Sequence, residues 1–105
     1  MNKNLNPKDA ERKIKAGKFT VIDVRTPEEF AEGHIAGGVN INISAPDFSQ
    51  KIESLDKGKE YLVYCRSGGR ASRAKEILES AGFGNVYNLT GGITGWVGDG
   101  LPTEN

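Results

Sequence analysis

The stretch "EYLVYCRSGGRASRAKEILESAG", residues 60–82, carries the strongest structural signal in this chain. Residues 60–65 are apolar, aromatic and β-branched, which predicts a short strand buried on both faces. Residues 71–82 repeat apolar side chains three and four positions apart, which predicts a helix with one apolar stripe. The stripe comprises Ala71, Ala74, Ile77, Leu78 and Ala81. A buried strand that leads directly into a helix is typical of a parallel sheet covered by helices.

The segments on either side repeat this alternation. Helix patterns occupy residues 6–17, 26–33 and 45–58, strand patterns occupy residues 19–24, 37–43 and 85–89, and a short helix or turn fits residues 91–100. Thr26 is a suitable N-cap before Pro27, and Glu29 completes a capping box. The chain has 105 residues, enough for one small core. We therefore expect a single three-layer α/β domain over residues 1–105, with a mainly parallel sheet flanked by helices and right-handed crossovers.

Composition excludes several classes of function. The formal net charge at pH 7 is zero, which argues against bulk attraction to nucleic acid or to an anionic membrane. One cysteine and one histidine permit neither an internal disulfide nor a zinc site within one chain. No apolar run approaches the ~20 residues of a membrane span, and residues 1–19 lack the apolar stretch of a signal peptide. We expect a cytoplasmic protein that binds neither nucleic acid nor membrane and keeps its thiol reduced.

The single cysteine, Cys65, stands at the carboxyl end of the predicted strand, where ligands gather in parallel sheets. Gly68 and Gly69 allow the backbone N–H groups to curl around an anion, and the following helix start adds unpaired N–H groups. Arg66 and Arg70 add guanidinium groups that suit oxyanions. A thiol in this setting should ionise readily and act as a nucleophile. The alternative is an inert buried cysteine, which the glycines, the arginines and the helix start disfavour.

The spacing of the loop bears on the reaction. Cysteine phosphatases separate the cysteine from a phosphate-binding arginine by five residues, and Ala71 occupies that position here. Arg70 comes one position earlier, so the loop is tighter and suits a sulfur atom better than a phosphoryl group. A phosphatase or an arsenate reductase remains an alternative at this point.

Two segments of the sequence resemble the rhodanese family of sulfurtransferases. Residues 21–41, "VIDVRTPEEFAEGHIAGGVNI", are similar to the family's Asp-Val-Arg, Glu-Phe and Gly-His-Ile signature. Residues 61–96 are similar to its active-site strand, loop and helix, followed by a Gly-Gly and Trp closing segment. The resemblance covers over half the chain. It implies a rhodanese-like fold and thiosulfate sulfurtransferase activity, with no metal or organic cofactor.

The resemblance also implies the roles of the loop residues. Cys65 would attack the outer sulfur of thiosulfate, or of a related persulfide donor, and would carry it as a persulfide until a thiol or cyanide removes it. Donor binding would fall to Arg66, Ser67, Gly68, Gly69 and Arg70. One alternative is a sulfur-relay or sensing module that receives persulfide from a protein partner. Another is a non-catalytic interaction domain, which the intact Cys65 argues against.

Outside the loop we expect structural roles. His34, the only histidine, could form a pair with the cysteine, but its place in "GHIAGG" favours structural hydrogen bonding. Asp23 and Arg25 follow a strand and should form an ion pair that braces the loop. Packing roles are expected for Phe30, Tyr64 and Trp96.

Overall fold

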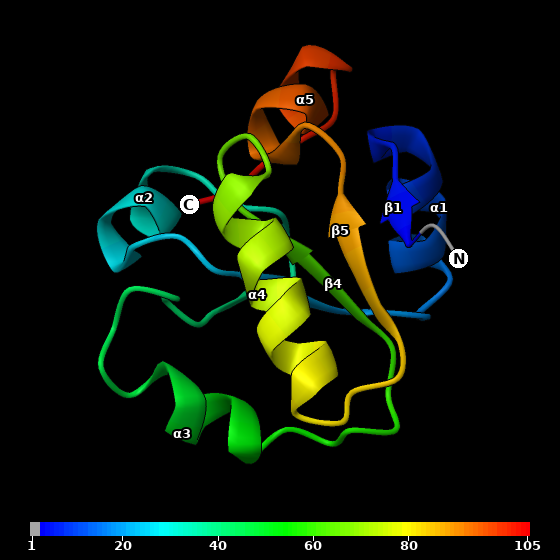
Figure 1. Ribbon diagram of the computed structural model, residues 1–105. Coiled ribbons are helices and arrows are strands. Elements are labelled where there is room, and N and C mark those ends of the chain that lie inside the picture. Colours follow the sequence, from blue (N-terminus) through cyan, green and yellow to red (C-terminus); the bar gives the residue numbers. More distant parts are fainter. Residues whose placement is uncertain (1–2) are drawn as a thin grey trace.

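A five-stranded parallel sheet forms the centre of the computed structural model, which describes residues 3–105 (Figure 1). Its strands are β1 (Asn4–Leu5), β2 (Thr20–Asp23), β3 (Val39–Asn40), β4 (Tyr61–Tyr64) and β5 (Val86–Leu89), and their order across the sheet is β1-β5-β4-β2-β3. Every pair of neighbouring strands is parallel. The segments that follow the strands therefore emerge at one edge of the sheet, and the predicted parallel α/β fold is confirmed.

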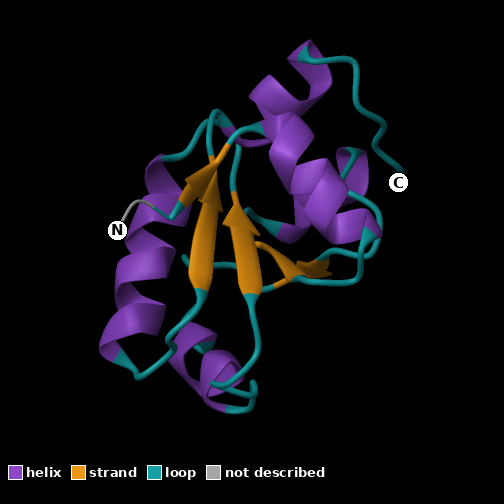
Figure 2. Cartoon of the chain, turned by 90° about the vertical axis from the view of Figure 1, so that its right-hand side faces the viewer, coloured by secondary structure: helices purple, strands orange, loops and turns teal. Residues whose placement is uncertain are grey.

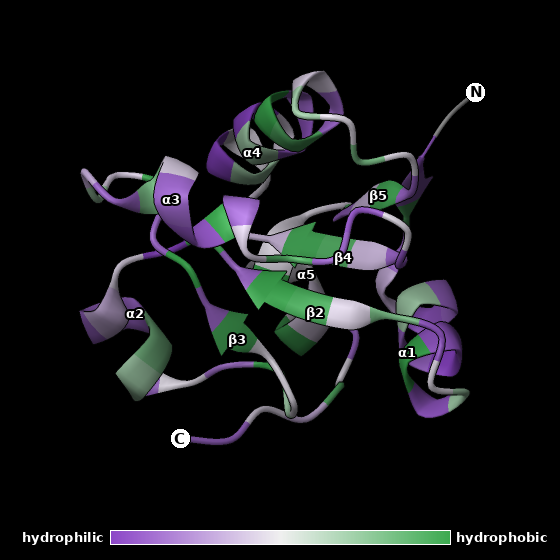
Figure 3. Cartoon of the chain, turned by 90° about the horizontal axis from the view of Figure 1, so that it is seen from below, coloured by the Kyte–Doolittle hydropathy of each residue, from purple (hydrophilic) through white to green (hydrophobic). Residues whose placement is uncertain are grey.

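Five helices in the described part of the chain surround this sheet: α1 (Pro7–Lys15), α2 (Pro27–Glu32), α3 (Phe48–Glu53), α4 (Gly69–Ser80) and α5 (Gly92–Gly98). Figure 3 shows α3 and α4 on one face and α1 and α5 on the other, and Figure 2 shows helices flanking the strands on both sides. α2 follows directly after β2. No helix among residues 3–105 has the length and apolar character needed to cross a bilayer.

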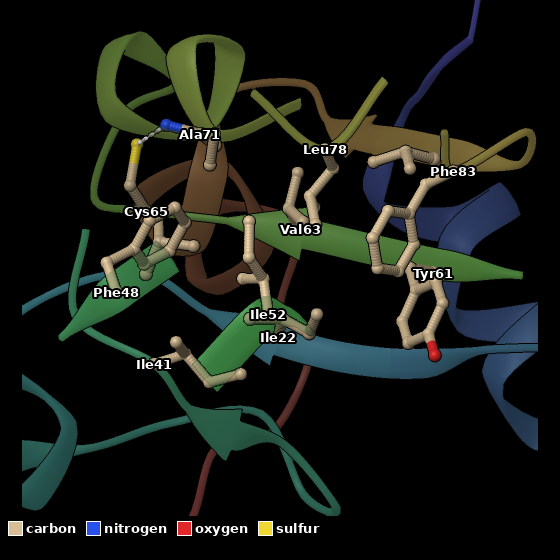
Figure 4. Close-up of a cluster of buried hydrophobic side chains, with 13 residues drawn as sticks. Ile22, Ile41, Phe48, Ile52, Tyr61, Val63, Cys65, Ala71, Leu78 and Phe83 are labelled. Atoms are coloured by element: carbon tan, nitrogen blue, oxygen red, sulfur yellow. Dashed lines mark hydrogen bonds between the residues drawn. The ribbon is translucent and has the colours of Figure 1, made fainter. Parts of the chain in front are cut away.

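The two faces of β4 supply two hydrophobic cores. Tyr61 and Val63 pack with α3 and α4, whereas Leu62 and Tyr64 pack on the side of α1 and α5. All four side chains are at most 2% exposed, so the predicted burial on both faces is confirmed. In α4 the buried part of the stripe is formed by Ala71, Ala74 and Leu78. Figure 4 shows this α3–α4 core, with Cys65 at the end that lies under the start of α4.

The predicted start of α2 is confirmed at atomic detail. Oγ1 of Thr26 accepts a hydrogen bond from the backbone N–H of Glu29 at 3.2 Å, and Oε1 of Glu29 accepts one from the N–H of Thr26 at 3.2 Å. This reciprocal capping box satisfies two N–H groups that the helix itself leaves unpaired. It also fixes the position of the Glu29 carboxylate at the edge of the sheet where the strands end.

Several element boundaries differ from the prediction. α3 covers Phe48–Glu53 instead of residues 45–58, because turns occupy the chain on both sides of it. β3 covers only Val39–Asn40 instead of residues 37–43, because the chain continues along β2 through separate bonds such as Ile41 N–H to Asp23 O at 2.9 Å. β1 was not predicted, since two residues, Asn4 and Leu5, are too few to show a strand pattern; pairing with β5 forms it. α4 begins at Gly69 rather than residue 71, which places Arg70 in the first turn of the helix.

Candidate active site

The sulfur of Cys65 lies where β4 ends and α4 begins. The side chain is only 1% exposed. Its Sγ accepts hydrogen bonds from the backbone N–H of Gly68 at 3.0 Å and of Ala71 at 3.4 Å, the second of which is drawn in Figure 4. Both donors belong to the start of α4, whose dipole places partial positive charge there. The loop therefore directs its N–H groups at the sulfur, an arrangement that stabilises negative charge on that atom.

The two adjacent glycines have different roles in this loop. Gly68 has a φ of +131°, a backbone conformation that favours glycine, and its N–H donates to the sulfur. Gly69 does not have positive φ and is the first residue of α4. The prediction that a glycine curls the backbone is confirmed for Gly68, whereas Gly69 belongs to the helix.

The start of α5 is hydrogen-bonded to the backbone of the cysteine loop. The N–H groups of Ile93 and Thr94 donate to the carbonyl oxygens of Cys65 and Arg66, at 2.9 and 3.1 Å. Gly92 has a φ of +59°, and a Cβ placed on it would lie 2.5 Å from both of those carbonyl oxygens. Sequence reasoning placed the Gly-Gly pair at the start of a short helix or turn but did not find this contact, because it joins segments about 27 residues apart.

Arg70 is paired with Glu29, which sequence analysis had assigned only to capping. Nη1 of Arg70 donates to Oε1 of Glu29 at 2.7 Å, and Nη2 donates to Oε2 at 3.1 Å. The hydrogen bond from Arg70 is the main cause that lowers the pKa of Glu29 to about 2, against a smaller opposing effect of burial. The same bond raises the pKa of Arg70. By contrast, Arg66 is exposed and forms no ion pair within residues 3–105.

The predicted ion pair between Asp23 and Arg25 is confirmed. Nη2 of Arg25 donates to Oδ2 of Asp23 at 2.7 Å, and Nε donates to Oδ1 at 3.0 Å. Nη2 also donates to the carbonyl oxygen of Gly33 at 2.7 Å, which ties the end of α2 to the segment after β2. Both charged side chains are buried, and their mutual hydrogen bonds satisfy groups that would otherwise be costly to desolvate.

His34 has the structural surroundings that its sequence position indicated. Its Nδ1 lies 2.9 Å from the carbonyl oxygen of Phe30, and its ring stacks on the Phe30 ring at a centroid distance of 3.7 Å. Its backbone N–H and C=O exchange hydrogen bonds with those of Glu104, each at 2.8 Å. No contact between His34 and Cys65 occurs among the described residues, so the structure does not form a cysteine–histidine pair.

The aromatic residues also have the predicted packing roles. Tyr64 is fully buried, burial raises the pKa of its phenol, and its hydroxyl accepts a hydrogen bond from the N–H of Ile35 at 3.1 Å. Trp96 is buried and its Nε1 donates to the carbonyl oxygen of Pro102 at 2.8 Å. Both polar atoms are thereby satisfied within the α1–α5 core.

Two clefts flank the cysteine loop. One has a volume of about 390 Å³ and is lined by Arg25, which follows β2, and by residues of α2, α5 and the C-terminal segment, among them Glu29 and Thr94. The other has a volume of about 380 Å³, and its walls include Ser67, Gly68 and Gly69. The loop residues predicted to bind a donor thus reach solvent at Arg66 and along the second cleft. A small anion could approach the loop from this side.

Comparisons with known proteins agree with this geometry. The sequence model described as the rhodanese-like domain matches residues 6–99. Thiosulfate sulfurtransferase 16 of Arabidopsis thaliana, a chloroplastic protein, is 40% identical over 93 residues, which span 79% of this chain and 78% of that protein. YtwF of Bacillus subtilis is 40% identical over 101 residues and 95% of both chains. The crystal structure of a rhodanese-related protein from Thermoplasma volcanium superposes with a TM-score of 0.87, at 36% identity and over 97% of both chains. The chain therefore belongs to the family of rhodanese-like domains.

Proposed function

We propose that this protein is a sulfurtransferase that carries a sulfane sulfur on Cys65, with thiosulfate or a related persulfide as the donor. The observation that carries the proposal is the pair of N–H groups, from Gly68 and Ala71, directed at the cysteine sulfur. They suit a thiolate or a persulfide anion at this position. The chain's similarity to an Arabidopsis protein named thiosulfate sulfurtransferase supports the same reaction.

The proposed reaction has two displacement steps. The Cys65 thiolate attacks the outer sulfur of thiosulfate, a new S–S bond forms, and the original S–S bond breaks with its electron pair leaving on sulfite. A thiolate acceptor, or cyanide in an assay, then attacks the outer sulfur of the Cys65 persulfide. That attack restores the thiolate and releases a persulfide or thiocyanate. Neither step requires a proton from the protein, a metal or an organic cofactor.

The other loop residues are proposed to bind the donor or to position the loop. Arg66 follows Cys65 in the chain and is exposed, and it is proposed to attract the anionic end of the donor. Ser67, Gly68 and Gly69 line the cleft beside the loop, where their polar backbone groups would contact the donor. Arg70 directs one N–H of each terminal nitrogen at Glu29, so two of its five N–H donors are already occupied. Its main effect would be to hold the first turn of α4 against α2.

The test is to incubate the protein with thiosulfate and to search for one added sulfur atom by intact mass. Cyanide is then added and thiocyanate is measured. The expected result is one sulfur per chain, followed by thiocyanate release, with both lost in Cys65→Ser. Absence of the adduct and of thiocyanate would refute the proposal, as would activity that survives in Cys65→Ser. A persulfide that forms from a protein donor but not from thiosulfate would favour a sulfur-relay module instead.

A further inference from the structure

In the folded protein, carboxylates compensate part of the positive charge that neighbouring basic residues bring to the cysteine loop. Between Tyr61 and Lys75 the sequence contains four basic residues and no acidic one. In the structure Glu29 pairs with Arg70, and Glu79 pairs with Lys75 at 3.1 Å. Arg66 is the only arginine flanking the loop that has no ion pair among the described residues. Arg73, in the second turn of α4, also has no ion pair among the described residues, so two of the four positive charges are compensated and two are not.

Glu29 is held in place independently of Arg70. Its Oε1 is fixed by the capping box at the start of α2, and its side chain is 21% exposed. The two oxygens then match the two terminal nitrogens of Arg70, the geometry of a bidentate pair. Arg70 lies within electrostatic reach of Cys65, which contributes to the raised pKa of this arginine. By compensating Arg70, the Glu29 carboxylate therefore lowers the positive potential at the Cys65 sulfur.

Resting on the sulfurtransferase function proposed above, we propose that Glu29 is a positioning residue that selects the charge of the sulfur donor. By compensating Arg70, it favours donors that carry one negative charge at the reacting end, such as organic persulfides and thiosulfonates, over the thiosulfate dianion. The displacement at the outer sulfur is the same for both classes. With methanethiosulfonate the leaving group that takes the electron pair is methanesulfinate, and with thiosulfate it is sulfite.

Glu29→Gln tests the proposal without removing the cap, because glutamine at this position still completes a capping box. The variant adds one unit of positive charge near the loop. At separations of about 6–8 Å and an effective dielectric constant of about 40–80, one additional donor charge then changes binding by about 2- to 10-fold. The expected result is that the ratio of kcat/KM for thiosulfate to kcat/KM for methanethiosulfonate rises by about that factor.

Three further variants make the test specific. Glu28→Gln removes the same charge from the neighbouring exposed residue of α2, which pairs with no described residue, and should change the ratio by less than about 1.5-fold. Arg70→Gln leaves the Glu29 charge uncompensated and should lower the ratio. Glu29→Gln combined with Arg70→Gln restores the net charge and should return the ratio to within about twofold of the original protein.

The outcomes separate this inference from the proposed function. An unchanged ratio in Glu29→Gln, or an equal change in Glu28→Gln, overturns the inference. A ratio that falls in Glu29→Gln overturns it as well. If Glu29→Gln does not fold, the opposite shift expected for Arg70→Gln decides the question. Absence of sulfur transfer from both donors in the unaltered protein would refute the sulfurtransferase function itself, whatever the variants show.

Discussion

Replacing Gly92 with alanine should displace the loop that carries Cys65. The new Cβ would lie 2.5 Å from the carbonyl oxygens of Cys65 and Arg66 and 2.6 Å from the carbonyl carbon of Arg66. These atoms belong to the backbone, so no flexible side chain can swing away. To reach an ordinary contact, the loop and the start of α5 must separate by roughly 1 Å. That movement would strain the bonds from the Ile93 and Thr94 N–H groups to the same two oxygens.

Two contributions set the magnitude for Gly92→Ala. Its φ of +59° is left-handed, and an L-residue with a Cβ is less stable there by about 1–2 kcal/mol. Forcing a methyl group into a closely packed position costs a further ~1–3 kcal/mol. The free energy of unfolding should therefore fall by about 2–5 kcal/mol. Sulfur transfer should slow by up to roughly 100-fold in the molecules that remain folded, since an error of about 1 Å in a reacting group can have that effect.

Urea unfolding and single-turnover formation of the Cys65 persulfide measure the two effects separately. Gly91→Ala is the matched control for strain, because Gly91 has a φ of +78° while its Cβ would lie 3.4 Å from the nearest atom, an ordinary contact. Gly98→Ala is the control for helix content, since a Cβ there meets nothing within 4 Å. The reasoning is refuted if Gly92→Ala loses no more stability than Gly91→Ala, or if its single-turnover rate equals that of Gly98→Ala.

Three other predictions concern residues that hold the site. The pKa of Glu29 is lowered to about 2, so its pairing with Arg70 stabilises the fold above pH 4.5, and this stabilisation is lost as the pH falls toward 2. After allowance for solvent exposure, the pairing should contribute about 1–2 kcal/mol to the free energy of unfolding. Urea unfolding of the original protein and of Glu29→Gln, each at pH 5 and at pH 2.5, measures this contribution. Asp23→Asn leaves the buried guanidinium of Arg25 without its counter-charge and should lower the free energy of unfolding by about 3–5 kcal/mol in the same assay. Leu62→Ala empties a fully buried position in the central strand and should lower it by about 2–5 kcal/mol.

Each of these predictions has a matched control in the chain. Glu28→Gln should leave the acid dependence of stability unchanged, and a loss equal to that of Glu29→Gln would contradict the assignment. Asp9→Asn breaks an exposed pair with Arg12 and should change stability by less than about 0.5 kcal/mol, so a similar loss in both aspartate variants would argue against burial as the cause. Val97→Ala alters a side chain that is 55% exposed and should have little effect compared with Leu62→Ala.

Local patterns predicted the elements that present the cysteine. The apolar run before Cys65 predicted a strand buried on both faces, and each face indeed packs in its own core. The Thr26 and Glu29 spacing predicted the capping box that begins α2. Such features depend on side chains and backbone within a few residues of each other, so their energetics are contained in a short segment of sequence.

Sequence pattern was insufficient where a contact joins distant segments. β1 is too short to show a period, and it exists because the edge of β5 pairs with it. The positive charge expected around Cys65 was read from neighbours in sequence, whereas its compensation by Glu29 comes from a helix 41 residues away.

The strand, the loop and the helix around Cys65 can be predicted from sequence, because hydrophobic period, capping and glycine conformation act locally. The charge around that loop and the backbone contacts that support it depend on the three-dimensional arrangement of the elements. The parallel crossovers bring α2 and the start of α5 to the edge of the sheet where β4 ends, and there Glu29 compensates Arg70 while Gly92 allows close backbone contact beneath the cysteine. Charge and steric fit depend on distances in space, which residue spacing along the chain does not specify.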